Sequence, residues 1–136
     1  IIKNWTYFPI VSGMAGTHGN AIHVSNALTA IYLATGQDTA CVAENSIGHF
    51  TIEKVDDGIT WRLTLPSLTV GTVGGGTRLN QQQQNLQLLG CDNGDKHTSR
   101  KLAEIIAGAA LGLEISLGSA IMSHTWTSAH MKYGRK

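Results

Sequence analysis

The stretch "HFTIEKVDDGITWRLTLPSLTV", residues 49–70, decides the fold class of this chain. Apolar and polar residues alternate on both sides of "DDG" at 56–58, and such alternation around a turn signal is typical of a β-hairpin. Pro66 cannot donate a hydrogen bond to a neighbouring strand, so the chain is expected to bend or to lie at an edge there. The sequence therefore predicts one small β-element.

Helical patterns flank the hairpin on both sides. Residues 18–36 carry apolar side chains three and four positions apart and end at Gly36, which predicts a mostly buried helix. Residues 81–90 form a second, short helix in this prediction, ending at Gly90. A long helix is predicted from about 100 to 122, capped by Thr98 or Ser99. Its small residues favour close approach of another helix: Ala107, Gly108, Ala109, Ala110 and Gly112. The predicted class is α+β, with buried helices and a β-hairpin or small sheet.

Composition narrows the possible functions. The 136 residues suffice for one domain with a real core, and no repeat or linker divides them. Only 14% of the residues are charged, which suggests that a partner covers part of the surface. A net charge of +1 gives no basic patch for nucleic acid or an anionic membrane. Cys41 and Cys91 form no CxxC motif; reduced thiols are expected, with one disulfide as the alternative.

The N-terminal stretch "IIKNWTYFPIV" has neither an initiator Met nor the order of a signal peptide. We therefore expect a segment of a longer, cytoplasmic polypeptide. The apolar run at 102–122 is long enough to span a bilayer, but it contains Glu104 and Glu114. Because a carboxylate inside lipid is costly, we expect a buried helix of a soluble protein instead of a membrane segment.

The glycine cluster "GTVGGGTRLN", residues 71–80, invites a test for phosphate binding. It lacks the third small residue of a GxGxxG fingerprint and the GK[ST] of a P-loop. Two interpretations remain open: a turn between elements, or a backbone that a ligand can approach closely because Cβ atoms are missing.

Four polar residues are candidates for a site, each with a plainer alternative. Asp38 follows the helix stop at Gly36, where a solvated loop residue is common. His130 lies in the tail, where a histidine can be inert. His23 and Asn26 lie three positions apart on one helical face. Their side chains either face a ligand or form hydrogen bonds only within the fold. The histidines and cysteines show no metal-ligand spacing, so no metal is expected.

Taken together, four segments resemble a known family. These are "GMAGTHGNAIHVSNALTAIYLATGQD", "TLPSLTVGTVGGGTRLNQQQ", "LAEIIAGAALGLEISLGSA" and "SAHMKYGRK". In this order they are similar to the C-terminal part of the catalytic, or large, domain of 3-hydroxy-3-methylglutaryl-CoA (HMG-CoA) reductase, class I. The resemblance covers nearly all of residues 1–136 from about Lys3 onward.

The resemblance implies an NADPH-dependent reduction of HMG-CoA to mevalonate and CoA, in the mevalonate route to isoprenoids. It implies catalytic roles for Asp38 and His130, and a substrate-facing helix with His23 and Asn26. By the same resemblance Leu117 forms an apolar wall beside the substrate, and Gly74 and Gly75 lie near the cofactor. Lys3 corresponds to a substrate-carboxylate lysine, although extra residues separate it from "GMAG".

The resemblance also predicts what this segment lacks. The family's catalytic glutamate and lysine and its NADP-binding small domain belong to an upstream part, and its active sites form between subunits of a homo-oligomer. Lys136 stands where some class I enzymes carry a phosphorylatable serine, so such control is not expected. Two alternatives remain: a non-catalytic assembly or regulatory remnant of the same fold, and an unrelated domain that binds nucleotide through the glycine loop.

Overall fold

The fold combines helices with one hairpin, which confirms the α+β class. The computed structural model describes the backbone of residues 2–92 and 95–134, and the side chains of residues 7–92 and 95–134. Its helices and strands follow in the order α1 (Ile2–Met14), α2 (Val24–Thr35), α3 (Val42–Asn45), β1 (His49–Val55), β2 (Gly58–Thr64), α4 (Asn80–Leu88), α5 (Thr98–Met122) and α6 (Thr125–Tyr133). Two short 3-10 helices, η1 (Thr39–Cys41) and η2 (Gly75–Arg78), precede α3 and α4.

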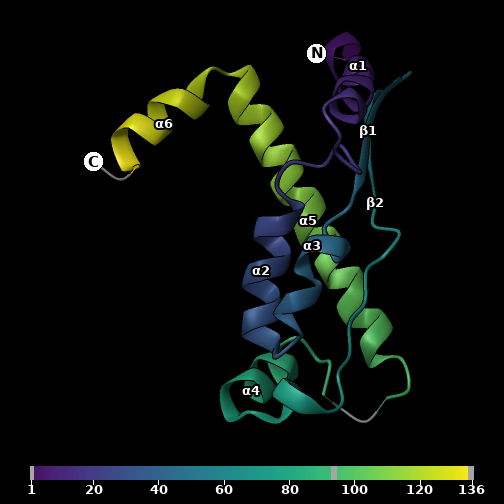
Figure 1. The fold of residues 1–136 in the computed structure, drawn as a ribbon, viewed down its shortest axis with the longest axis vertical. Coiled ribbons are helices and arrows are strands. Elements are labelled where there is room, and N and C mark those ends of the chain that lie inside the picture. Colours follow the sequence, from purple (N-terminus) through teal and green to yellow (C-terminus); the bar gives the residue numbers. More distant parts are fainter. Residues whose placement is uncertain (1, 93–94, 135–136) are drawn as a thin grey trace.

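The core lies between α2 and α5, which run side by side in Figure 1. Each helix contributes one apolar stripe, and α4 closes the lower end of the pair. The buried cluster consists of Val24, Ala27, Leu28, Tyr32, Leu86, Cys91, Leu102, Ile106 and Ala110. Burial of these side chains is the main force that aligns the two helices.

Helix α2 begins later than the predicted residue 18. The Asn20 side chain donates to the Phe50 carbonyl and accepts from the Phe50 amide, each at 2.7 Å, so it is tied to β1. Gly19 packs so closely that a Cβ there would lie 2.6 Å from the Gly48 oxygen. These long-range contacts hold residues 18–23 out of the helix, whereas Gly36 ends it as predicted, with a φ of 69°.

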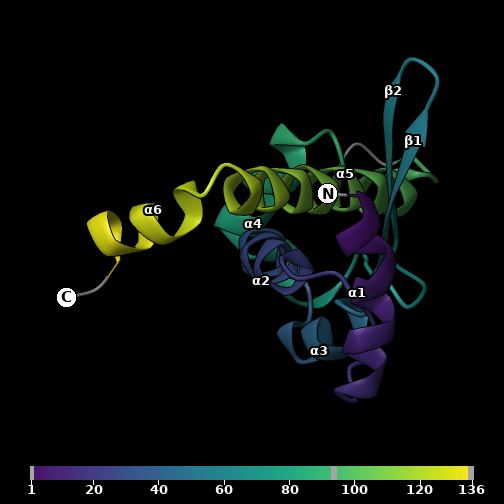
Figure 2. The same ribbon diagram turned by 90° about the horizontal axis from the view of Figure 1, so that it is seen from above.

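The predicted hairpin is confirmed, with its turn at Asp56 and Asp57. β1 and β2 pair antiparallel from His49↔Thr64 to Val55↔Gly58. Phe50 and Ile52 are buried on one face, while the far end of the hairpin extends from the body in Figure 2. The chain turns at Pro66, as its missing N–H predicts.

Helix α5 differs from its prediction at its start. Thr98 does not cap it but is its first residue, and its hydroxyl shares a 2.7 Å hydrogen bond with Thr72. Asp95 forms the preceding turn, accepting from the His97 amide at 3.0 Å. The prediction of a side-chain cap by Thr98 or Ser99 is therefore wrong, because these residues continue the helix.

The rest of α5 buries one stripe only. Its buried residues are four positions apart: Thr98, Leu102, Ile106, Ala110, Glu114 and Gly118. A Cβ at Gly108 or Gly112 would meet nothing within 4 Å, so these two glycines mediate no close helix approach within the described chain. By length and composition alone α5 could cross a membrane, with a mean hydropathy of 1.8 over a window that is 22% buried. This is weak evidence for a span, since core helices of soluble proteins meet the same criterion.

Candidate functional site

The beginning of α2, the end of α5 and the helix α6 enclose a pocket of about 290 Å³. We call it the α6 pocket. It is lined by Ile22, His23, Asn26, Leu117, Ile121, Trp126 and His130. Four residues singled out from the sequence, His23, Asn26, Leu117 and His130, thus meet here, although they come from three segments far apart in the chain.

His130 has a defined orientation in this pocket. Its Nδ1 lies 2.8 Å from the Trp126 carbonyl oxygen one turn earlier, and the His130 and Trp126 rings lie against each other, tilted by 36°, at a centroid distance of 4.2 Å. A carbonyl oxygen only accepts, so Nδ1 carries a proton in this arrangement. Nε2 is left to exchange a proton with another molecule.

The tail that carries His130 is a helix, which the sequence analysis did not predict. Helix α6 follows His124, whose φ of 57° turns the chain sharply after α5. Figures 1 and 2 show α6 projecting away from the α2–α5 body. None of its residues is buried, and among the described residues its main contacts are with α5.

His23 is held by a residue that sequence reasoning did not place in the site. The Glu114 Oε1 atom accepts hydrogen bonds from the His23 amide at 2.6 Å and the Val24 amide at 3.2 Å. Glu114 is 1% exposed. A carboxylate stabilises a helix N-terminus, where free N–H groups and the helix dipole are positive. No local pattern could reveal this contact, because 91 positions separate the partners.

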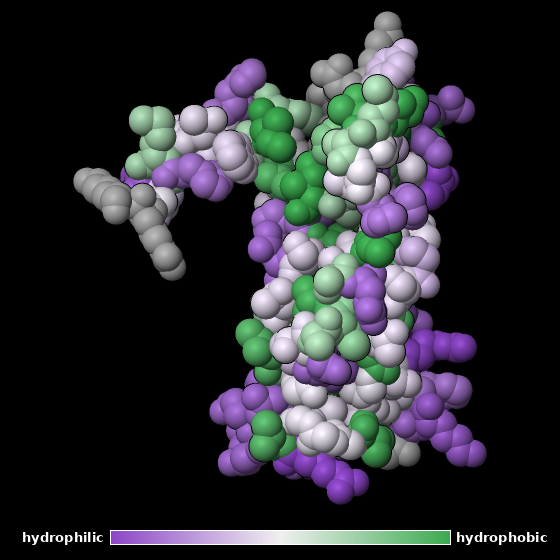
Figure 3. All heavy atoms as spheres, in the orientation of Figure 1, coloured by the Kyte–Doolittle hydropathy of each residue, from purple (hydrophilic) through white to green (hydrophobic). Residues whose placement is uncertain are grey.

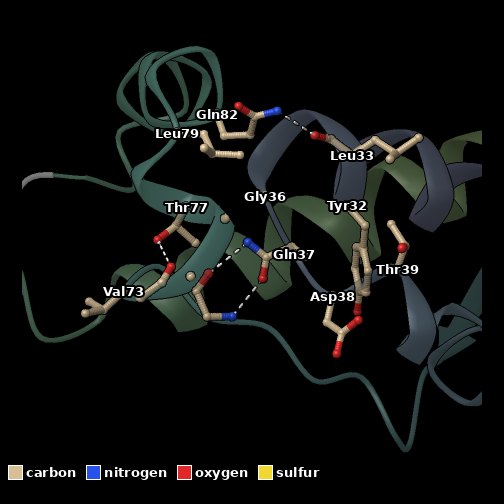
Figure 4. Close-up of a pocket in the computed structure, with 14 residues that line it drawn as sticks. Tyr32, Leu33, Gly36, Gln37, Asp38, Thr39, Val73, Thr77, Leu79 and Gln82 are labelled. Carbon is tan, nitrogen blue, oxygen red and sulfur yellow. Dashed lines mark hydrogen bonds between the residues drawn. The ribbon is translucent and has the colours of Figure 1, made fainter.

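A second pocket, of about 510 Å³, lies at the other end of α2 (Figure 4). We call it the glycine-loop pocket, since residues 71 and 73–77 form one wall. Gln37 joins this wall to α2: its side chain donates to the Gly71 carbonyl and accepts from the Gly71 amide, both at 2.8 Å. Gln37 was not singled out from the sequence, although it lies beside Asp38.

The glycines of this loop serve two different purposes. A Cβ on Gly36 would lie 2.3 Å from the Gly76 carbonyl carbon and oxygen, so these two residues allow backbone contact between α2 and the loop. Gly74 and Gly75 instead have φ values of 95° and 44°, and nothing lies within 4 Å of a Cβ on either. Their positive φ values fit the interpretation as a turn, and the open space beside them is compatible with close approach of a ligand, which stays a prediction.

Asp38 lies on the rim of the glycine-loop pocket and is exposed. Its Oδ1 accepts from the Ala40 amide at 3.0 Å, which fixes the carboxylate at the start of η1. Removal from water raises the pKa of the nearby Cys41 thiol, and the negative charges of Asp38 and Glu44 raise it further. Cys41 and Cys91 are both free thiols, as expected.

The two residues with predicted catalytic roles do not meet within this chain. Asp38 follows the C-terminal end of α2 and His130 faces its N-terminal end, and the 12 residues of α2 span about 18 Å. Lys3 lies in α1, and its side chain falls outside the described part. Among the described residues no group of three or more potential ligands could hold a metal ion.

The buried Tyr32, which lines the same pocket as Asp38, connects α2 to the segment before the glycine loop. Its hydroxyl donates to the Thr69 carbonyl at 2.9 Å and accepts from Asn45 Nδ2 at 2.7 Å. Burial raises the pKa of Tyr32, and the Asn45 hydrogen bond partly offsets this. This network fixes the floor of the glycine-loop pocket.

Comparison with known proteins gives a consistent result. The family model for hydroxymethylglutaryl-coenzyme A reductase matches residues 2–135. A 3-hydroxy-3-methylglutaryl-coenzyme A reductase of Methanocaldococcus jannaschii is 41% identical over 134 residues, covering 98% of this chain. One from Aeropyrum pernix is 46% identical over 127 residues, and reductase 2 of Gossypium hirsutum is 47% identical over 132 residues, each covering 91% of this chain.

The same comparisons show how much of a relative this chain represents. It spans 32% of the Methanocaldococcus protein, 30% of the Aeropyrum protein and 21% of the Gossypium protein. The chain therefore spans about a third or less of the length of these curated relatives.

Proposed function

Because the chain belongs to the hydroxymethylglutaryl-coenzyme A reductase family, an oxidoreductase family of the mevalonate pathway, we propose that it forms part of an HMG-CoA reductase. The complete enzyme would reduce HMG-CoA to mevalonate and CoA with two molecules of NADPH. The observation that carries the proposal is the convergence of His23, Asn26, Leu117 and His130 in the α6 pocket. The pocket is lined by both polar and apolar side chains, which suits a substrate that carries both polar and apolar groups.

In this proposal His130 is the general acid. Reduction of a thioester expels a CoA thiolate, which reverses the step unless it is protonated. A histidine has a pKa near about 6.5 and can donate a proton at neutral pH. The 2.8 Å contact between Nδ1 and the Trp126 carbonyl supports this role, because it directs Nε2 away from the helix. Helix α6 projects from the body, so it can close over a bound substrate.

Asp38 is proposed to act on a different part of the reaction. The thioester carbonyl becomes an oxyanion, which a nearby cation stabilises. In the family a lysine from outside this segment supplies that cation, and a carboxylate beside it keeps it charged. Asp38 is exposed and held by the Ala40 amide, and both features suit it to meet a group from another part of the protein.

Gly74 and Gly75 are proposed to contact NADPH. The observation that fits is the open space where their Cβ atoms would stand, which lets a ligand approach the backbone. When bound, NADPH supplies the hydride. The chain's own contribution is a wall of fixed shape, which the Gln37 hydrogen bonds to Gly71 hold against α2.

Because Asp38 and His130 lie at opposite ends of α2, we propose that a complete site also needs the upstream part of the enzyme or a second subunit. We take residues 1–136 as the C-terminal portion of the catalytic domain. The low charge content supports a covered surface and a homo-oligomer.

The test is to express the complete gene and to follow NADPH oxidation with HMG-CoA. We expect two NADPH consumed and one free CoA thiol released for each HMG-CoA. A folded, oligomeric protein that consumes no NADPH would support the non-catalytic remnant instead. Nucleotide binding by residues 1–136 alone would favour the independent nucleotide-binding domain.

A further inference from the structure

Two buried polar atoms without partners belong to two residues that one hydrogen bond joins at the start of α2. The bond joins the His23 amide to Glu114 Oε1 at 2.6 Å. The unpartnered atoms are the second carboxylate oxygen, Glu114 Oε2, and the ring nitrogen His23 Nδ1. Buried polar atoms are nearly always hydrogen-bonded, so this coincidence on two bonded residues calls for an explanation.

The chemistry of the two atoms is complementary. A carboxylate oxygen only accepts, whereas a neutral imidazole donates from whichever nitrogen carries the proton. The Glu114 Oε1 atom is already occupied by the amides of His23 and Val24, which fixes the carboxylate in place. Oε2 is left without a donor and His23 Nδ1 without a partner; the two atoms do not bond to each other in the structure, so pairing them requires the His23 ring to turn toward Oε2 with the proton on Nδ1.

We propose that Glu114 is a positioning residue for the substrate pocket: in the complete enzyme the His23 ring turns toward the carboxylate, and a direct Nδ1–H···Oε2 hydrogen bond, which this structure does not contain, fixes the ring and its tautomer. Nε2 then carries a lone pair and faces the α6 pocket as an acceptor. A carboxylate behind a histidine sets ring orientation and tautomer in the same way at metal and catalytic sites. The pairing of Glu114 with His23 does not depend on the proposed function. Only the idea that a substrate binds to Nε2 rests on it.

The geometry explains why the carboxylate belongs to α5. Three positions after Glu114, Leu117 lines the α6 pocket, and His23 and Asn26 lie on the opposing α2 wall. Residues three apart on a helix lie on neighbouring positions of one face. One short segment of α5 therefore supplies both an apolar wall and the support behind the polar wall.

The substitution Glu114→Gln separates this role from simple capping. The His23 and Val24 amides still require an acceptor, so the amide oxygen of the new side chain takes the Oε1 position and its NH₂ group takes the Oε2 position. A donor then faces His23 Nδ1, which must become an acceptor. The tautomer is thereby reversed, with the proton on Nε2.

The measurement is histidine-selective 15N NMR of the complete enzyme at about pH 8, where an ordinary imidazole is neutral. His23→Gln identifies the His23 signals. We expect the Nδ1–H tautomer in the parent protein and the Nε2–H tautomer in Glu114→Gln, together with about a tenfold lower kcat on HMG-CoA. Glu104→Gln is the matched control, because it makes the same change at an exposed position of α5 and should leave both readouts unchanged.

An Nε2–H tautomer in the parent protein would overturn the proposal, even if Glu114→Gln does not fold. An unchanged tautomer in a folded Glu114→Gln protein would overturn it as well. The NMR result does not depend on turnover, so an enzyme inactive on HMG-CoA would count against the proposed function and leave the Glu114–His23 pairing to be decided by the spectra.

Discussion

Gly36 and Gly76 touch backbone to backbone: a methyl group on Gly36 would lie 2.3 Å from both the carbonyl carbon and the carbonyl oxygen of Gly76. This contact seats the glycine loop on the end of α2 and so shapes the pocket that Asp38 borders. Since the contacting atoms are backbone, no side-chain rotation can relieve the clash.

Gly36→Ala should therefore destabilise the complete protein strongly. The left-handed conformation at Gly36 alone costs a side-chain-bearing residue about 1–2 kcal/mol, and the clash adds to this cost. We expect a clear fall in melting temperature, measured by calorimetry. Gly58→Ala is the control, because a Cβ at this hairpin position meets nothing within 4 Å. Equal melting temperatures in the two variants would contradict the contact.

Asp38→Asn should preserve the fold and reduce turnover. An asparagine oxygen can still accept from the Ala40 amide, but the negative charge is lost. We expect kcat of the complete enzyme on HMG-CoA to fall about a hundredfold, the scale of losing a key electrostatic group. Asp57→Asn makes the same change at the exposed hairpin turn and should not affect kcat. Parent-like turnover in Asp38→Asn would exclude the proposed role.

His130→Gln should affect the two reduction stages differently. Only the thioester stage releases a thiolate, so kcat on HMG-CoA should fall about a hundredfold, a usual loss for a general acid. Reduction of mevaldehyde should fall much less. The comparison is steady-state kinetics on both substrates, with the exposed His97→Gln as control. Equal losses on both substrates would show that His130 positions the site and does not donate this proton.

Stability should decline at alkaline pH. The pKa values of Cys41, Cys91 and Tyr32 are raised in the fold, with burial as the first cause in each. These groups ionise in the unfolded chain from their ordinary values of 9.0 for cysteine and 10.0 for tyrosine, which favours unfolding as the pH rises. Denaturant titrations should give a steady free energy of unfolding below about pH 8.5 and a falling one above it.

Tyr32→Phe tests this assignment, since it should flatten the alkaline decline even though it lowers stability overall. Tyr133→Phe, at a 76% exposed position, should leave the slope unchanged. An identical slope in both variants would mean that Tyr32 does not contribute.

The isolated 136-residue segment should self-associate. Figure 3 shows apolar surface gathered at the end of the molecule where α1 and the end of α5 lie. Exposed side chains of α1 include Tyr7, Ile10, Val11 and Met14, the last of them 84% exposed. Such a patch normally marks a covered surface. Light scattering should detect oligomers or aggregates, and a monomer that melts cooperatively would refute the expectation.

Several features of the fold could be predicted from the sequence because they depend on neighbouring residues. The "DDG" turn with alternating flanks specifies the hairpin, and Gly36 specifies the end of α2 through its positive φ. The apolar periodicity of residues 102–122 specifies a helix. The motifs around Asp38 and His130 were enough to identify the family, since they carry that information in their order and identity.

Other features were decided by the tertiary structure, because hydrogen bonds and contacts between distant residues override local preference. The Asn20 side chain, bound to Phe50 30 positions away, delays the start of α2. The Glu114 carboxylate fixes that start from α5, and only the packing of α2 on α5 brings it there. The α6 pocket likewise exists only because α5 ends in a sharp turn at His124, after which α6 contributes Trp126 and His130 to the same pocket as His23. Sequence periodicity describes one element at a time, whereas a pocket is a property of how elements pack.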